Sequence, residues 1–110
     1  MTHPLEIAPQ ELAQKLARGE AVWLLDVRHE WEHQLARLPD QAHVPLQELQ
    51  QRLDEVTPPP GVLVVAYCHH GVRSLSAAAF LRQAGFPEAV SLAGGIDLWS
   101  RAIDPSVPQY

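Results

Sequence analysis

The residues with the clearest chemical potential are Cys68-His69-His70-Gly71-Val72-Arg73-Ser74, which directly follow the apolar run Val62 to Tyr67. Cys68 is the only cysteine among the 110 residues, so its chemistry is that of a thiol rather than of an internal disulfide. A thiol reacts as its thiolate, which nearby N–H groups and positive charge favour. Gly71 permits a tightly curled backbone, and Arg73 supplies a guanidinium. The pattern therefore predicts a loop that holds a reactive, negatively charged sulfur.

The elements on either side of this loop determine where the sulfur lies. The run from Val62 to Tyr67 predicts a buried strand, and the residues from Ser74 to Ala84 predict a helix that ends at Gly85. Cys68 would then lie beyond the carboxyl end of a strand, where ligands of parallel sheets bind. Such loops can aim successive N–H groups inward beside the positive end of the helix. We therefore expect backbone N–H groups of this loop to point at the sulfur.

The remaining sequence alternates between strand-like and helix-like segments. Further strands are expected at residues 22–27, 42–44 and 89–92, and further helices at residues 9–18, at residues 46–56 and around Trp99. This alternation predicts an α/β fold with a mostly parallel sheet covered on both faces. The length fits a single domain over residues 1–110, with a core at about residues 5–103 and a loosely ordered C-terminal tail at residues 104–110.

Composition excludes several classes of function. The net charge is -5 and Lys15 is the only lysine, so no basic stripe is available for nucleic acid. The apolar runs are much shorter than the roughly 20 residues that cross a bilayer. Met1 to Glu6 lack a basic stretch followed by an apolar one, so we expect no secretory signal and a cytoplasmic location.

Several polar residues have more than one interpretation. Arg73 either acts on the sulfur in the loop or forms a salt bridge at the start of the helix with no catalytic role. Asp26, at the end of the strand at 22–27, is either a solvated turn carboxylate or a group that orients Arg28 or the loop. His69 and His70 either face solvent or tune the charge near neutral pH. Cys68, His69 and His70 are adjacent and cannot readily surround one ion, so we expect no metal and no cofactor.

The run from Cys68 to Ser74 matches C-x-x-G-x-R-S and resembles the active-site loop of the rhodanese family. Further stretches are similar to other motifs of that family: Asp26-Val27-Arg28, Leu38-Pro39, Val44-Pro45, and Gly94-Gly95 followed by Trp99. The resemblance covers about residues 5–103. It implies a single rhodanese-like domain, doubly wound, in which a mostly parallel five-stranded sheet carries helices on both faces.

The resemblance also implies a reaction, a set of site residues and a cradle for the sulfur made by the loop backbone from His69 to Arg73. Cys68 and Arg73 would be catalytic, and the substrate-binding residues would be His69, His70, Gly71, Val72, Ser74, Asp26 and Arg28. A thiosulfate sulfurtransferase would move sulfur from a small-molecule donor such as thiosulfate to Cys68. The resulting persulfide would pass its outer sulfur to cyanide or to a thiol acceptor. A cysteine desulfurase or a thioredoxin-like protein would be a candidate partner.

Other functions compete with this one. Phosphatases and arsenate reductases also place a cysteine and an arginine around an oxyanion, but with a longer spacing, and here only four residues separate Cys68 from Arg73. A persulfide carrier with little turnover of free thiosulfate stays open. A regulatory binding module that kept the fold and lost turnover is a third alternative.

Overall fold

The computed structural model describes residues 4–39 and 41–110, so part of the N-terminal stretch on which the absence of a secretory signal was predicted lies outside the described residues. In this part of the chain five parallel strands form one sheet in the order β1-β5-β4-β2-β3. The strands are β1 (Glu6–Ile7), β2 (Val22–Asp26), β3 (Gln41–His43), β4 (Leu63–Tyr67) and β5 (Val90–Leu92). The helices are α1 (Pro9–Ala17), α2 (Glu30–Leu35), α3 (Val72–Gln83) and α4 (Gly95–Ala102). None of these described helices combines the length and apolarity that a membrane span requires.

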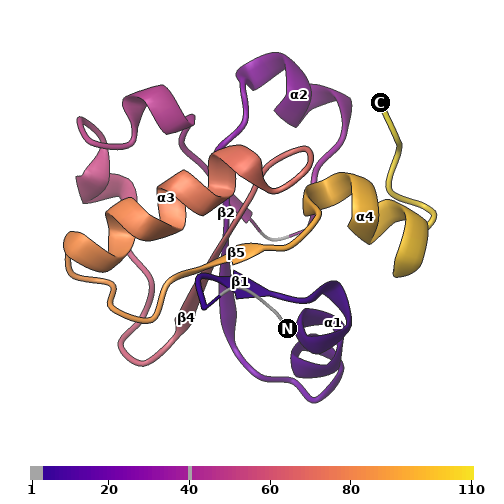
Figure 1. The fold of residues 1–110 in the computed structure, drawn as a ribbon, viewed down its shortest axis with the longest axis horizontal. Helices are drawn as coiled ribbons and strands as arrows, with labels where there is room; N and C mark the ends of the chain where they lie inside the picture. Colours follow the sequence, from indigo (N-terminus) through magenta and orange to yellow (C-terminus); the bar gives the residue numbers. More distant parts are fainter. Residues whose placement is uncertain (1–3, 40) are drawn as a thin grey trace.

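Helices cover both faces of the sheet, which confirms the predicted α/β architecture (Figure 1). On one face, α1 and α4 bury Leu12 and Trp99 against the core. On the other face, α3 packs Leu81 over the sheet. Successive residues of a strand point to opposite faces. Cys68, which follows β4, therefore joins the core layer beneath α3.

The loop after β4 is shorter than predicted. We expected α3 to begin at Ser74, but it begins at Val72, so only Cys68 to Gly71 separate the strand from the helix. Gly71 has a φ of +97°, in the left-handed region that favours glycine. This conformation turns the chain into the helix two residues early, and Arg73 consequently lies in the first turn of α3.

The prediction of a helix at residues 46–56 is wrong. The structure has two isolated 3-10 turns instead, at Leu46–Glu48 and Leu53–Glu55. A spacing of three between apolar residues suits a 3-10 turn as well as an α-helix. Leu49 and Val56 are buried against the α3 layer, so the apolar pattern is satisfied without a continuous helix.

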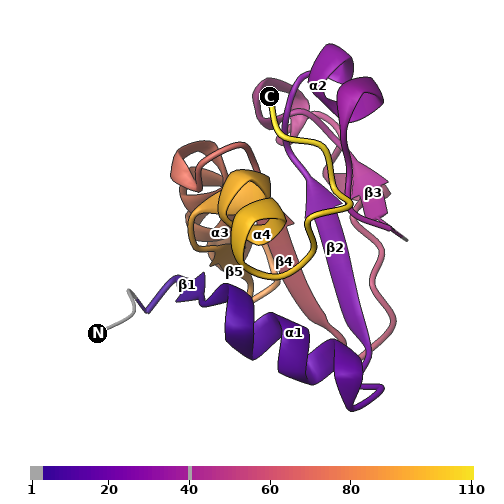
Figure 2. The same cartoon turned by 90° about the vertical axis from the view of Figure 1, so that its right-hand side faces the viewer.

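Two segments have structure that the sequence did not predict. Helix α2 was not predicted, because its apolar residues Trp31 and Leu35 are exposed while Glu32 is buried. The tail from Asp104 onward, expected to be loosely ordered, packs against the domain through buried Val107. Figures 1 and 2 show this tail rising from α4 and ending beside α2.

The turn Gly94-Gly95 fixes the loop of Cys68 against α4, which leads to a test of stability. An added Cβ on Gly95, where φ is +64°, would lie 2.4 Å from the carbonyl oxygen of His69. Gly95→Ala should therefore lower the free energy of unfolding by about 3 kcal/mol, as backbone strain and overpacking add. Gly85→Ala is the matched control, because φ is +110° there and no heavy atom lies within 4 Å of the new Cβ. Equal losses for the two variants in urea unfolding would contradict the close approach at Gly95.

Candidate active site around Cys68

The carboxyl ends of neighbouring strands bring the polar residues of the site together. Because β2, β3 and β4 are parallel, they end at the same edge of the sheet. The register pairs Asp26 with both His43 and Tyr67, the residue before Cys68. The strand order therefore places Cys68 beside the end of β2, at Asp26.

The sulfur of Cys68 is held by backbone and hydroxyl groups. The N–H groups of Gly71 and Ser74 donate to Sγ at 3.1 and 3.3 Å, and the hydroxyl of Ser74 lies 3.3 Å from it. Inward-aimed N–H groups were expected along the span from His69 to Arg73. In the described part of the chain Gly71 is the only residue of that span whose N–H reaches the sulfur, and the second N–H comes from Ser74, just beyond it.

The same sulfur is buried. Cys68 is 1% exposed and packs within the core layer beneath α3. A free, solvent-facing thiol would be the simplest form of a reactive cysteine. The surrounding core therefore leaves almost none of Cys68 open to solvent in this structure.

Arg73 binds a carboxylate that the sequence did not point to. Its guanidinium donates to both oxygens of Glu32 on α2, at 2.7 and 2.8 Å, instead of turning to the sulfur. Burial by itself raises the pKa of Glu32, but the hydrogen bonds from Arg73 and Tyr110 outweigh it and lower the pKa to about 2. The same pairing raises the pKa of Arg73. The one sequence signal for Glu32 is its place three residues after His29, whose backbone N–H it accepts at 3.1 Å.

Asp26 and Arg28 form a fully buried ion pair, which decides between the two interpretations of Asp26. The Asp26 carboxylate accepts the backbone N–H of Arg28 and two guanidinium N–H groups, at 2.7 to 3.0 Å. Burial raises the pKa of Asp26, but the hydrogen bonds from Arg28 and His33 outweigh it and hold the pKa below its usual value. Asp26 is therefore buried and paired with Arg28, and it is not a solvated turn residue.

Tyr110 lies at the centre of the site, although the sequence placed it in a loose tail. Its hydroxyl accepts from Arg28 Nη1 at 2.8 Å and donates to Glu32 Oε2 at 2.7 Å. Burial raises the pKa of Tyr110 to about 12. Its ring stacks on His69 at a centroid distance of 4.0 Å, and His69 stacks in turn on His70 at 3.9 Å. No sequence spacing connects a C-terminal tyrosine with a loop more than 40 residues away.

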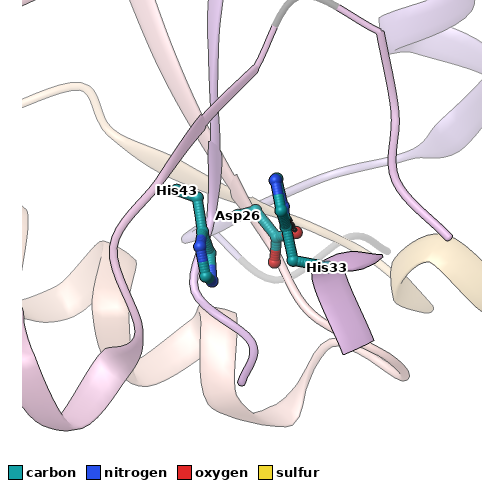
Figure 3. A group of neighbouring side chains, drawn as sticks. All are labelled: Asp26, His33 and His43. Atoms are coloured by element: carbon teal, nitrogen blue, oxygen red, sulfur yellow. Dashed lines mark hydrogen bonds and ion pairs between the residues drawn. The ribbon is translucent and has the colours of Figure 1, made fainter. Parts of the chain in front are cut away.

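Asp26 also belongs to a group with His33 and His43, which Figure 3 shows facing one another. Nδ1 of His33 lies 2.9 Å from Asp26 Oδ2, and Nε2 of His43 lies 2.8 Å from the carbonyl oxygen of Arg28. The two rings are stacked 4.2 Å apart and nearly parallel, so their lone pairs do not converge on one point. Because Arg28 already occupies the carboxylate, this group is described best as a hydrogen-bonded cluster.

A model of the rhodanese-like domain matches residues 8–102 of the chain. The chain belongs to the rhodanese-like domain family. This rhodanese-like domain is 38% identical to a protein of Allochromatium vinosum named "Sulfurtransferase", over 87% of the chain and 88% of that protein. Its fold matches the crystal structure of a rhodanese-like domain protein from Staphylococcus aureus with a TM-score of 0.79, at 25% identity, over 96% of this chain and 97% of that one.

Other relatives are longer than this rhodanese-like domain. The chain spans 25% of the "Adenylyltransferase and sulfurtransferase MOCS3" of Arabidopsis thaliana, at 32% identity over 94% of the chain. It spans 50% of the "Putative sulfur carrier protein YrkF" of Bacillus subtilis, at 30% identity over 86% of the chain. The rhodanese-like domain is thus found both in proteins of this size and as a part of larger ones.

The lowered pKa of Glu32 predicts a pH dependence of stability. A carboxyl whose pKa is lower in the folded state contributes stability above its unfolded pKa and loses it as the pH falls through the folded value. For Glu32 the loss should extend from about pH 4.5 to about pH 2 and amount to about 3 kcal/mol. Glu32→Gln should flatten this part of the profile in urea unfolding. The exposed Glu11→Gln is the control, and a wild-type slope in Glu32→Gln would contradict the assignment.

The bridge made by Tyr110 predicts a separate loss. Tyr110→Phe removes the hydroxyl that joins Arg28 to Glu32 but keeps the ring on His69. The two charged partners then lose one hydrogen bond each, so the free energy of unfolding should fall by about 2 kcal/mol. Tyr110→Ala should cost more, since the stacking is lost as well. Wild-type stability of Tyr110→Phe in the same unfolding measurement would show that the bridge does not form in solution.

Proposed function

We propose that this rhodanese-like domain is a sulfurtransferase that carries sulfur as a persulfide on Cys68. The observation that supports this most directly is the set of donors aimed at one sulfur: two backbone N–H groups and the Ser74 hydroxyl. Donors of this kind stabilise a negatively charged sulfur. The relative named "Sulfurtransferase", which matches over most of both chains, supports the same class of reaction.

The proposed reaction has two displacement steps. The Cys68 thiolate attacks the outer sulfur of a donor such as thiosulfate, the bond to the inner sulfur breaks, and sulfite leaves with the electron pair. A thiolate or cyanide then attacks the terminal sulfur of the persulfide. The Cys68 thiolate leaves with the electron pair of the sulfur–sulfur bond, which restores the resting enzyme. Atoms and charge balance without a metal or another cofactor.

The other predicted site residues take supporting roles in this proposal. Gly71 and Ser74 hold the sulfur directly. Arg73 is a positioning residue, because its guanidinium ties the first turn of α3 to Glu32. His69, His70 and Val72 would line the approach to the sulfur. Asp26 and Arg28 would support that arrangement through their buried ion pair.

Which molecule serves as the sulfur donor depends on the charges at the site. The sulfonate end of thiosulfate needs a positive group, and the guanidinium of Arg73 is already neutralised by Glu32. Trp31 and Val72, the neighbours of these two residues in sequence, are 61% and 75% exposed. Exposed apolar side chains such as these can pack against a protein partner, whereas they offer a small dianion neither charge nor hydrogen bonds.

These features favour a second candidate function, in which the domain is a persulfide carrier. It would be loaded by a cysteine desulfurase and would pass its sulfur to a thioredoxin-like or other protein thiol. The relative named "Putative sulfur carrier protein YrkF" supports this alternative. A reducing, cytoplasmic setting fits either function, since it keeps Cys68 available as a thiol.

Loading with sulfur is the direct test of the proposed function. Intact-mass spectrometry after incubation with thiosulfate or a persulfide donor should show a mass gain of one sulfur atom, reversed by cyanide or dithiothreitol. Cys68→Ala should show no gain, because it removes the only thiol. A fully folded wild-type domain that no sulfane-sulfur donor loads would rule out both candidate functions.

The two candidates differ in the source of the sulfur. Turnover of thiosulfate to thiocyanate in the presence of cyanide should be compared with loading from a desulfurase and free cysteine. We expect faster loading from the desulfurase, because Arg73 offers thiosulfate no free charge. Efficient thiosulfate turnover would instead eliminate the carrier.

A further inference from the structure

Two buried hydroxyl groups continue inward from the sulfur of Cys68. The Ser74 hydroxyl lies 3.3 Å from Sγ and 2.7 Å from the hydroxyl of Ser91. Both serines are 0% exposed. Ser91 lies in the middle of β5, where the backbone pairs with β1 on one side and β4 on the other. The Ser91 hydroxyl, the farther of the two from the sulfur, is therefore carried by a strand that is paired on both sides.

The direction of the two hydrogen bonds can be worked out by counting donors. If Ser91 donates to Ser74 and Ser74 donates to Sγ, both hydroxyl protons have acceptors. In the opposite direction the thiol donates to Ser74 and Ser74 donates to Ser91. The Ser91 proton then has no acceptor in the described part of the chain, since its only hydrogen-bond partner there is Ser74. An unsatisfied hydroxyl in a site closed to solvent is costly, so the first direction is favoured.

We propose that Ser91 is a positioning residue for sulfur transfer, because its hydroxyl turns the Ser74 hydroxyl so that it donates to Cys68 Sγ. This inference rests on the proposed function and extends it to both steps. In the first step the donated proton stabilises the attacking thiolate. In the second step it stabilises the thiolate that leaves the persulfide. Hydrogen bonds in a chain also polarise one another, which strengthens the bond to the sulfur.

Other titratable and charged groups face the loop from every element packed against it, and they set the background for this effect. They are His69 and His70 on the loop, Arg73 on α3 with Glu32 on α2, Tyr110 in the tail, Asp97 on α4 with its partner Arg101, and the pair of Asp26 and Arg28 at the end of β2. The Ser91 variants described below leave all of them in place. A change in the titration of the sulfur can therefore be assigned to the hydroxyl groups.

The test is the pH titration of the Cys68 thiolate, followed by its ultraviolet absorbance. Each variant is compared with the same variant carrying Cys68→Ala, so that tyrosine absorbance cancels. This readout requires no reagent to enter the buried site. Ser91→Ala should raise the midpoint of the titration by about half a pH unit, because the Ser74 hydroxyl loses its orienting donor. Ser91→Thr keeps a hydroxyl and should return the midpoint to the wild-type value.

A matched control and a double-variant cycle separate this role from a structural one. Ser100 is also buried and donates its hydroxyl to the carbonyl oxygen of Val107, away from the sulfur. Ser100→Ala should thus lower stability without moving the midpoint. In a Ser74→Ala background, Ser91→Ala should produce no further shift, because the group through which it acts is absent.

The outcomes each decide the inference. A wild-type midpoint in Ser91→Ala, or an equal shift with and without Ser74, would overturn it. Ser91→Val is the second probe if Ser91→Ala does not fold, since β-branched residues suit a strand interior. The titration uses no sulfur donor. A shifted midpoint in a domain that cannot be loaded with sulfur would refute the proposed function and leave the link between Ser91 and Cys68 standing. A domain that is loaded with sulfur but shows an unshifted midpoint would support the proposed function and refute that link.

Discussion

A continuous series of charged hydrogen bonds holds the site together, and the arrangement of the loop depends on it. The series runs from Asp26 through Arg28, Tyr110 and Glu32 to Arg73. It joins the end of β2, the C-terminal tail, α2 and α3. Charges taken out of water must be paired, because an isolated buried ion costs several kcal/mol. Each member of the series therefore constrains its neighbours. Through Arg73 the series fixes the first turn of α3, and with it the loop of Cys68 that leads into this helix.

Those parts of the fold that bury apolar residues in a simple pattern were predictable from the sequence. The continuous apolar run before Cys68 indicated β4, and the proline of α1 marked where that helix begins. The C-x-x-G-x-R-S loop indicated both the cysteine and the strand end. In these segments local propensity and tertiary packing favour the same structure, so local reasoning succeeds.

The missed features share one physical cause, which is pairing between residues distant in sequence. Glu32 is the inward residue of α2, so that helix lacks the apolar stripe that reveals a helix to pattern analysis. Tyr110 becomes important only through Arg28 and Glu32, both about 80 residues away. Ser91 is a polar residue in a buried strand, and its meaning appears only beside Ser74. Such partners are set by topology and not by local spacing.

The burial of Cys68 has two opposite effects on the reactivity of its sulfur. Exclusion of solvent strengthens each hydrogen bond to the sulfur, since the local dielectric is low. The same exclusion limits the entry of a donor molecule. The tail that carries Tyr110 and the first turn of α3 are both hydrogen-bonded to Glu32, which holds these two segments together beside the loop.

The strand order also affects how the molecule behaves in a crowded solution. The two outermost strands, β1 and β3, have only two and three residues, whereas β2 and β4 inside the sheet have five each. An exposed strand edge is a template on which other chains can add and aggregate. Here the long strands lie inside and the rims offer few free backbone groups, so the domain is protected against edge-to-edge growth into larger assemblies.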